Sequence, residues 1–109
     1  MAYDERLADR VRDVLAEREV REQKMFGGLA FMVCGHMCVG LLGNELMVRV
    51  GPEAYADALR RPGAREMDFT GRPMRGLVMV GPDALGGRAL RTWVQRGLDY
   101  VDTLPPKSR

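Results

Sequence analysis

Residues 25–50 read MFGGLAFMVCGHMCVGLLGNELMVRV, and this stretch decides the fold. Its apolar segments are interrupted at Cys34-Gly35 and at Gly43-Asn44. Both dipeptides suit a two-residue hairpin loop, the second better, because glycine tolerates the positive φ of a type II′ turn. We therefore predict three antiparallel strands at residues 28–33, 36–42 and 45–50.

The two short loops also predict which residues oppose each other, because the length of a hairpin loop sets the register of its strands. The first loop pairs Val33 with His36, and the second pairs Leu42 with Glu45. The opposed pairs that follow are Phe31 and Cys38, Leu29 and Gly40, Gly40 and Met47, and Cys38 and Arg49.

Alternation along these strands sorts the side chains into an apolar face and a mixed face. The apolar face holds Ala30, Met32, Met37, Val39, Leu41, Leu46, Val48 and Val50. The mixed face holds Leu29, Phe31, Val33, His36, Cys38, Gly40, Met47 and Arg49. Since an antiparallel sheet with one dry face packs helices on that side only, we expect the helices on the apolar face.

Further elements are predicted on both sides of this stretch. Apolar residues at helical spacing predict a helix over residues 3–19, with Asp4 and Glu5 at the positive end of its dipole, and a second helix over 88–104. Pro52 opens a short helix through residue 59, an edge strand lies near 65–68, and a strand covers 77–80.

These elements define the fold class as α+β. We expect two layers: an antiparallel sheet of about five strands, and on one face of it the N-terminal helix, the C-terminal helix and a short middle helix. The chain is predicted to be one domain over residues 1–109, with a core at about 5–104 and a polar tail at 105–109. A length of 109 residues and 46% hydrophobic residues agree with a single globular domain.

The charges are balanced overall but segregated along the chain. The formal net charge is +2, from 17 basic and 15 acidic side chains. Residues 1–59 are net acidic and residues 60–109 net basic, so an anionic partner should prefer the second half. The chain start lacks a secretory signal, and its most apolar run is too short to span a bilayer. We expect a cytoplasmic protein with reduced thiols and no membrane contact.

Cys34, His36 and Cys38 form a C-x-H-x-C cluster that requires a test for metal and for catalysis. A structural zinc site needs about four ligands, and the chain has no further Cys or His, so we expect no metal and no cofactor. A Cys34–Cys38 disulfide is disfavoured, because four strand steps exceed the distance that a disulfide bridges. His36 is expected to be a solvated turn residue, although a catalytic pair with Cys38 remains an alternative.

Two groups of residues are candidates for contact with a partner. Arg72 and Arg75 bracket a proline in a loop that could present guanidinium groups to a phosphate or a carboxylate. Phe31, Met47 and Arg49 share the predicted mixed face, where Met47, Phe31 and Leu29 would form an exposed apolar patch. Internal pairing of the arginines with Glu66 and Asp68 is the alternative for the loop, and core filling is the alternative for the methionines.

Several of these segments resemble the N-terminal domain of the TfoX/Sxy competence regulators. The resemblance rests on four segments in the family's order, from about residue 5 to 106: residues 25–31, MFGGLAF; 46–51, LMVRVG; 67–76, MDFTGRPMRG; and the helix with Trp93-Val94. It implies a small α+β domain with an antiparallel sheet and flanking helices. It supplies no catalytic residues.

The resemblance also implies a role in regulation. Full-length members are associated with activation of natural-competence genes alongside the cyclic-AMP receptor protein, and they carry a separate C-terminal domain. No residues for that domain follow Arg109, so we expect a stand-alone, single-domain member.

Three functions follow as hypotheses. The first is a non-enzymatic cytoplasmic regulatory or protein-interaction module with a protein partner, in which a symmetric homodimer is also open. The second is a transcription accessory protein that contacts nucleic acid through the basic 60–75 segment, which a steep salt dependence of binding would reveal. The third is a small enzyme that uses Cys38 and His36.

Overall fold

The computed structural model describes residues 3–25, 27–67 and 75–105 of the chain. Its helices are α1 (Glu5–Val14), α2 (Tyr55–Leu59) and α3 (Ala89–Val101), with a short 3-10 helix, η1, at Pro82–Ala84. Its strands are β1 (Val20–Met25), β2 (Gly28–Val33), β3 (His36–Leu42), β4 (Glu45–Arg49), β5 (Ala64–Glu66) and β6 (Leu77–Val80). None of the helices in these ranges is long and apolar enough to cross a membrane.

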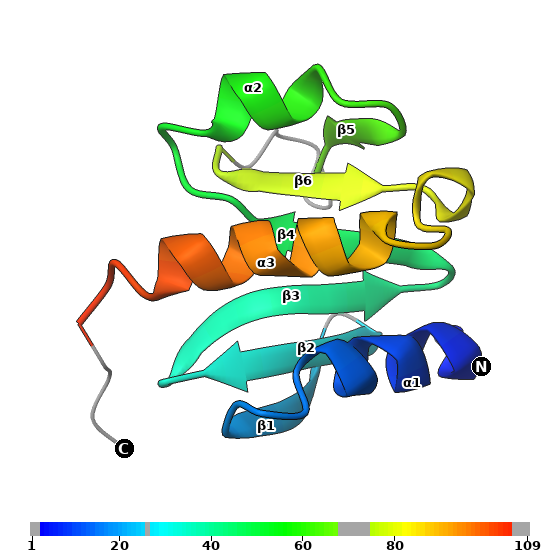
Figure 1. Cartoon of the computed structure of the whole chain (residues 1–109), viewed down its shortest axis with the longest axis vertical. Helices are drawn as coiled ribbons and strands as arrows, with labels where there is room; N and C mark the ends of the chain where they lie inside the picture. Colours follow the sequence, from blue (N-terminus) through cyan, green and yellow to red (C-terminus); the bar gives the residue numbers. More distant parts are fainter. Residues whose placement is uncertain (1–2, 26, 68–74, 106–109) are drawn as a thin grey trace.

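The strands form one antiparallel sheet in the order β1-β2-β3-β4-β6-β5. Figure 1 shows α1 and α3 side by side in front of the sheet, with α2 near the edge that β5 forms. The predicted α+β class, with N- and C-terminal helices and a short middle helix, is therefore confirmed. Both predicted hairpin loops are confirmed as well, because β2 ends at Val33 and β3 at Leu42.

The N-terminal region differs from its prediction. A helix was expected up to residue 19, but α1 ends at Val14. Residues 20–25 form an additional strand, β1, so the sheet has six strands rather than about five. The four central side chains of β1 are exposed, so the strand shows no apolar alternation that its sequence could reveal. The start of α1 is as expected: the Asp4 side chain caps the helix by accepting hydrogen bonds from the Arg6 and Leu7 amides, at 2.9 and 3.3 Å.

The register is confirmed for one hairpin and corrected for the other. Between β3 and β4, Gly40 lies opposite Met47, as predicted. Between β2 and β3, the pair at the turn is as predicted, but an irregularity then shifts the strands by one residue. Phe31 therefore lies opposite Val39 rather than Cys38. Cys38 is the additional residue of a β-bulge in β3, which a register counted from the loop alone cannot include.

This bulge reverses the predicted faces of β2. Leu29, Phe31 and Val33 lie with Val39 and Leu41 in the core between the sheet and the helices, although the prediction placed them on the mixed face. The predicted faces are confirmed for β4 and for β3 beyond the bulge, but not before it: Cys38, predicted on the mixed face, lies in the helix-side core, and Met37, predicted on the apolar face, packs on the other side. The helix-side core includes Val39, Leu41, Leu46, Val48 and Val50, as the apolar face required.

A second, smaller apolar cluster is formed by Met47, Met67 and Met79. Met37, Leu42 and Leu77 are partly buried against it. Met47 on β4 lies opposite Met79 on β6. The residues before and after each of them along the strand point to the helices, so these two methionines point to the other side. Methionine therefore fills a separate cluster on the helix-free side, which the prediction of a single dry face did not include.

Candidate functional site

A groove lies between the C-terminal half of α3 and the segment that joins β4 to α2. Its volume is about 670 Å³, within the roughly 300–1,000 Å³ that is usual for small-molecule sites. The lining residues are Val50, Pro52, Glu53 and Ala54 from the connection and Arg96, Asp99, Tyr100 and Thr103 from α3 and its end. Apolar side chains and ionisable groups thus share the same groove.

The connection is held against α3 by a glycine that has no room for a side chain. Gly51 has φ +85°, and a Cβ atom there would lie 2.3 Å from Cδ1 of Tyr100. The Gly51 backbone therefore packs directly on the tyrosine ring. The guanidinium carbon of Arg49 lies 5.5 Å from the centre of the same ring, within the range of a cation–π contact. Tyr100 is thus fixed by contacts from β4 and from the residues that follow it.

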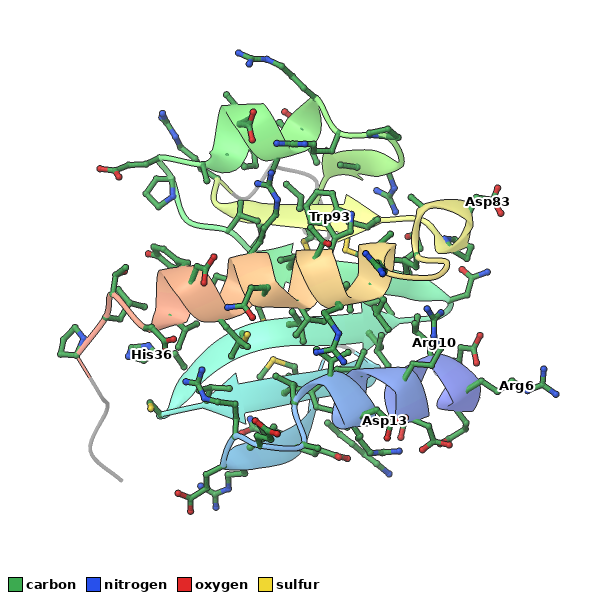
Figure 2. All side chains as sticks on the ribbon, viewed as in Figure 1. Arg6, Arg10, Asp13, His36, Asp83 and Trp93 are labelled. Carbon is green, nitrogen blue, oxygen red and sulfur yellow. The ribbon has the colours of Figure 1, made fainter. Side chains whose placement is uncertain are left out.

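Arg96 forms the boundary of the groove toward α2. Its guanidinium carbon lies 5.3 Å from the centre of the Trp93 ring, and its Nη2 donates to the Asp57 carboxylate at 3.2 Å. Arg61 donates to the same carboxylate at 3.3 Å. These two arginines hold the pKa of Asp57 below its ordinary value, chiefly through the hydrogen bond from Arg96. Trp93 is buried beneath this pair, and Figure 2 shows it on the side of α3 that faces α2.

Two carboxylates in the groove have no ion-pair partner within the described residues. Asp99 accepts a hydrogen bond from the neutral Gln95 amide at 2.8 Å, and Glu53 is exposed. The groove therefore combines an apolar floor at Val50 and Ala54 with acidic groups at its margin. Such a surface suits a partner that presents an apolar side chain beside a basic one.

Arg75 adjoins the groove through the backbone. The carbonyl of the next residue, Gly76, accepts hydrogen bonds from the amides of Val50 and Gly51 at 2.8 and 3.1 Å. The exposed Arg75 side chain also lies close enough to Tyr55 to lower its pKa, but burial of the tyrosine and the charge of Glu66 outweigh it and raise that pKa. The Tyr55 hydroxyl is buried and has no hydrogen-bond partner among the described residues.

The structure separates the five residues that the sequence nominated for partner contact. Phe31 is 0% exposed in the helix-side core, and Met47 is 2% exposed in the methionine cluster. The predicted exposed patch of Met47, Phe31 and Leu29 is therefore wrong, because the bulge turns Leu29 and Phe31 to the helix side and Met47 is buried against Met67 and Met79. Arg49 and Arg75 lie beside the groove, and Arg72 lies outside the described residues.

The upstream arginines of the predicted basic segment are partly neutralised. Arg65 donates to Glu45 at 2.6 Å, and Arg61 is bonded to Asp57. Internal pairing with acidic groups thus occurs, through Glu45 and Asp57. Of the two acids predicted for it, Asp68 lies outside the described residues. Because these pairs consume positive charge, the segment offers less of it to a polyanion than its composition suggests.

The residues of the cysteine–histidine cluster also lie in different environments. Both thiols are free, with Cys34 exposed in the turn and Cys38 buried. Burial raises the pKa of Cys38 to about 12, so the thiol stays protonated near neutral pH and is a poor nucleophile. Among the residues that the structure describes, no three His, Cys, Asp or Glu side chains come together in a group that could hold a metal ion.

His36 is not a solvated turn residue, and this prediction is wrong. It is only 8% exposed, and its Nε2 lies 2.7 Å from the Pro105 carbonyl, to which it donates. Figure 2 shows His36 beside the chain that leaves α3. No local sequence pattern indicates this contact, because the two residues are 69 positions apart.

The groove itself was not predicted from the sequence. Tyr100 and Asp99 lie within a regular helical pattern, and Glu53 follows a proline that signalled only a helix start. The one local signal was Gly51-Pro52, interpreted as the end of a strand. The groove forms only when α3 lies across the end of β4, and helical periodicity does not encode that placement.

Fold and groove together define a small α+β domain, with helices on one side of an antiparallel sheet and a mixed apolar and acidic groove at the end of α3. The family model of the TfoX N-terminal domain matches residues 13–100 of this chain. The chain therefore belongs to the TfoX N-terminal domain family, as its sequence motifs indicated. No match was found among curated proteins or among solved structures.

Proposed function

We propose that this chain is a non-enzymatic regulatory or protein-interaction module of the TfoX N-terminal domain family, which contacts a protein partner through the groove beside Tyr100. The observation that carries the proposal is the groove's composition: an apolar floor, the carboxylates of Glu53 and Asp99, which have no ion-pair partner in the part of the chain that the structure describes, and the adjoining Arg75. These groups fit a polypeptide segment with an apolar side chain flanked by charges.

Two further observations support a protein partner over the alternatives. The raised pKa of Cys38 disfavours a thiolate mechanism, which the third hypothesis would need. Arg61 and Arg65 are ion-paired, which weakens the case for nucleic acid. Phosphate contacts would make binding fall steeply with salt, so a titration with duplex DNA and with RNA at low ionic strength distinguishes this alternative. We expect no binding in either arm.

The test of the groove uses two charge-matched double variants. Arg75→Glu with Asp99→Lys reverses two exposed charges beside the groove, and Arg91→Glu with Asp83→Lys makes the same changes on exposed residues elsewhere. Both variants should unfold at the wild-type temperature. In affinity capture from the native cell with quantitative mass spectrometry, the groove variant should lose partners that the control variant and the wild type retain. Equal capture by all three chains contradicts the proposal.

A further inference from the structure

The sheet has two edge strands, and they differ in length and in what they expose. β5 is three residues long, whereas β1 is six residues long and, among the described strands, pairs only with β2. Figure 1 shows β1 at the margin of the sheet, with no described strand beyond it. Its four central side chains are exposed: Arg21, Glu22, Gln23 and Lys24. An edge of this kind presents backbone amide and carbonyl groups that can pair with another strand.

A second copy of the same edge can add to β1 only in certain registers. A two-fold axis perpendicular to the sheet makes the two strands antiparallel and keeps both helix layers on the same side. Opposed residues must then point to the same face, so their numbers differ by an even amount. Registers that pair at least three strand residues of each copy are centred on Arg21, Glu22, Gln23 or Lys24.

Charge selects one of these four registers. Centring on Arg21, Glu22 or Lys24 places a charged residue directly opposite its own copy, which is destabilising. Centring on Gln23 instead places an amide on the axis and Glu22 opposite Lys24 of the second copy, twice by symmetry. The edge is therefore complementary to itself in one register, with two opposite-charge pairs and no like-charge pair directly opposed.

Glu22 is already held in a suitable place. Its carboxylate accepts hydrogen bonds from Nε and Nη2 of Arg12 on α1, at 2.6 and 2.9 Å. This bidentate pair lowers the pKa of Glu22, so the carboxylate is charged over the physiological range. The Glu22 side chain remains 37% exposed. Because each carboxylate oxygen can accept more than one hydrogen bond, the carboxylate can also accept one from an ammonium group. Because the carboxylate is fixed by Arg12, less side-chain freedom is lost when the second copy binds.

We propose that two copies of this chain associate through β1, antiparallel and centred on Gln23, to form one continuous sheet across the dimer. The helix layers of both copies lie on the same side of that sheet, and the groove at Tyr100 is not part of the contact. The dimer is thus independent of the proposed partner site, and either can fail without the other.

Charge-reversal variants test the pairing. Lys24→Glu places glutamate opposite Glu22, and Glu22→Lys places lysine opposite Lys24, so each variant repels its own copy. In an equimolar mixture, both cross-strand pairs are again of opposite charge. By sedimentation velocity, we expect each variant alone to dimerise about tenfold more weakly than the wild type, and the mixture to recover dimerisation as a heterodimer. Circular dichroism and thermal unfolding establish that each variant is folded.

A cysteine on the axis gives an independent measurement. Opposed residues of an antiparallel pair have Cα atoms about 4.5–5.5 Å apart, a distance that a disulfide can bridge. In a Cys34→Ser background, which removes the exposed native thiol, Gln23→Cys should form a disulfide-linked dimer under mild oxidation. The matched control, Arg91→Cys in the same background, should not.

Three outcomes would overturn the proposal. The first is a wild-type chain that stays monomeric at millimolar concentration, with no cross-link at residue 23. The second is a dimer that neither charge reversal weakens, which would place the contact on another surface. The third is a monomer whose β1 edge captures a strand of a different protein, detected as loss of that capture in Lys24→Glu.

Discussion

At residue 97, two physical effects of opposite sign compete. Gly97 lies within α3, where replacement by alanine would favour the helix by about 0.8–1.0 kcal/mol. However, a Cβ atom there would lie 2.8 Å from the carbonyl oxygen of Cys38 and 3.0 Å from its Sγ. The bulge brings this part of β3 against the helix, so the close approach depends on the absence of a side chain.

We expect the clash to outweigh helix propensity in Gly97→Ala. Overpacking costs roughly 1–3 kcal/mol, and a backbone carbonyl cannot rotate away as a side chain can. The free energy of unfolding, measured in urea, should fall by up to about 2 kcal/mol, the difference between the two effects. The control is Gly81→Ala, because Gly81 has a φ of −73° and a Cβ atom there meets nothing within 4 Å. A Gly97→Ala chain more stable than the wild type would show that the helix and sheet are less tightly packed than described.

A second prediction at this scale concerns the pH dependence that Cys38 contributes. Its pKa is raised from 9.0 to about 12 in the folded chain, chiefly by burial. Above pH 9 the unfolded thiol releases its proton while the folded thiol keeps it, so this contribution is complete below pH 9 and is lost as pH rises toward 12. The loss has a limiting slope of roughly 1.4 kcal/mol per pH unit.

The measurement compares unfolding free energies of the wild type and Cys38→Ala from pH 8 to 11. Other groups that titrate in this range are shared by the two chains, so their difference isolates the Cys38 thiol. The stability advantage of the wild type should shrink steadily above pH 9. An advantage that stays constant with pH would mean that Cys38 ionises equally in the folded and unfolded chains.

At the scale of elements, those with a strong local sequence pattern were predicted correctly, and those without one were missed. Hairpin loops at Cys34-Gly35 and Gly43-Asn44 were predicted because glycine tolerates positive φ, which Gly35 and Gly43 adopt. β1 was missed because an exposed edge strand needs no apolar alternation. The bulge at Cys38 was missed because it depends on packing against α3, and no local sequence pattern marks it.

The α1 cap is an element whose contribution can be measured. Asp4→Ala removes the acceptor for the Arg6 and Leu7 amides and leaves both without an intrahelical partner. We expect a loss of about 1 kcal/mol in unfolding free energy, and Asp4→Asn should retain most of the wild-type stability because it keeps a capping oxygen. Equal losses in the two variants would point to the carboxylate charge rather than the hydrogen bonds.

At the scale of the whole molecule, Phe31 distinguishes the observed packing from the register that its loop predicted. It is 0% exposed between sheet and helices, so Phe31→Ala should cost roughly 3–5 kcal/mol in urea unfolding. Met32, its neighbour on the other face of β2, is only partly buried. Met32→Ala should therefore cost clearly less. A larger loss from Met32→Ala would restore the loop-derived register.

The sequence alone determined the class of fold, the family, the hairpins and two of the three helices close to their observed bounds. These features depend on interactions between residues near in sequence: turn conformation, helical periodicity and apolar alternation. Tertiary structure alone decided which face of β2 is buried, where His36 lies, and that Glu53, Asp99 and Tyr100 line one groove. Those outcomes depend on contacts between distant segments, above all α3 against β3 and β4, whose packing energy exceeds the cost of one bulge in the strand ladder.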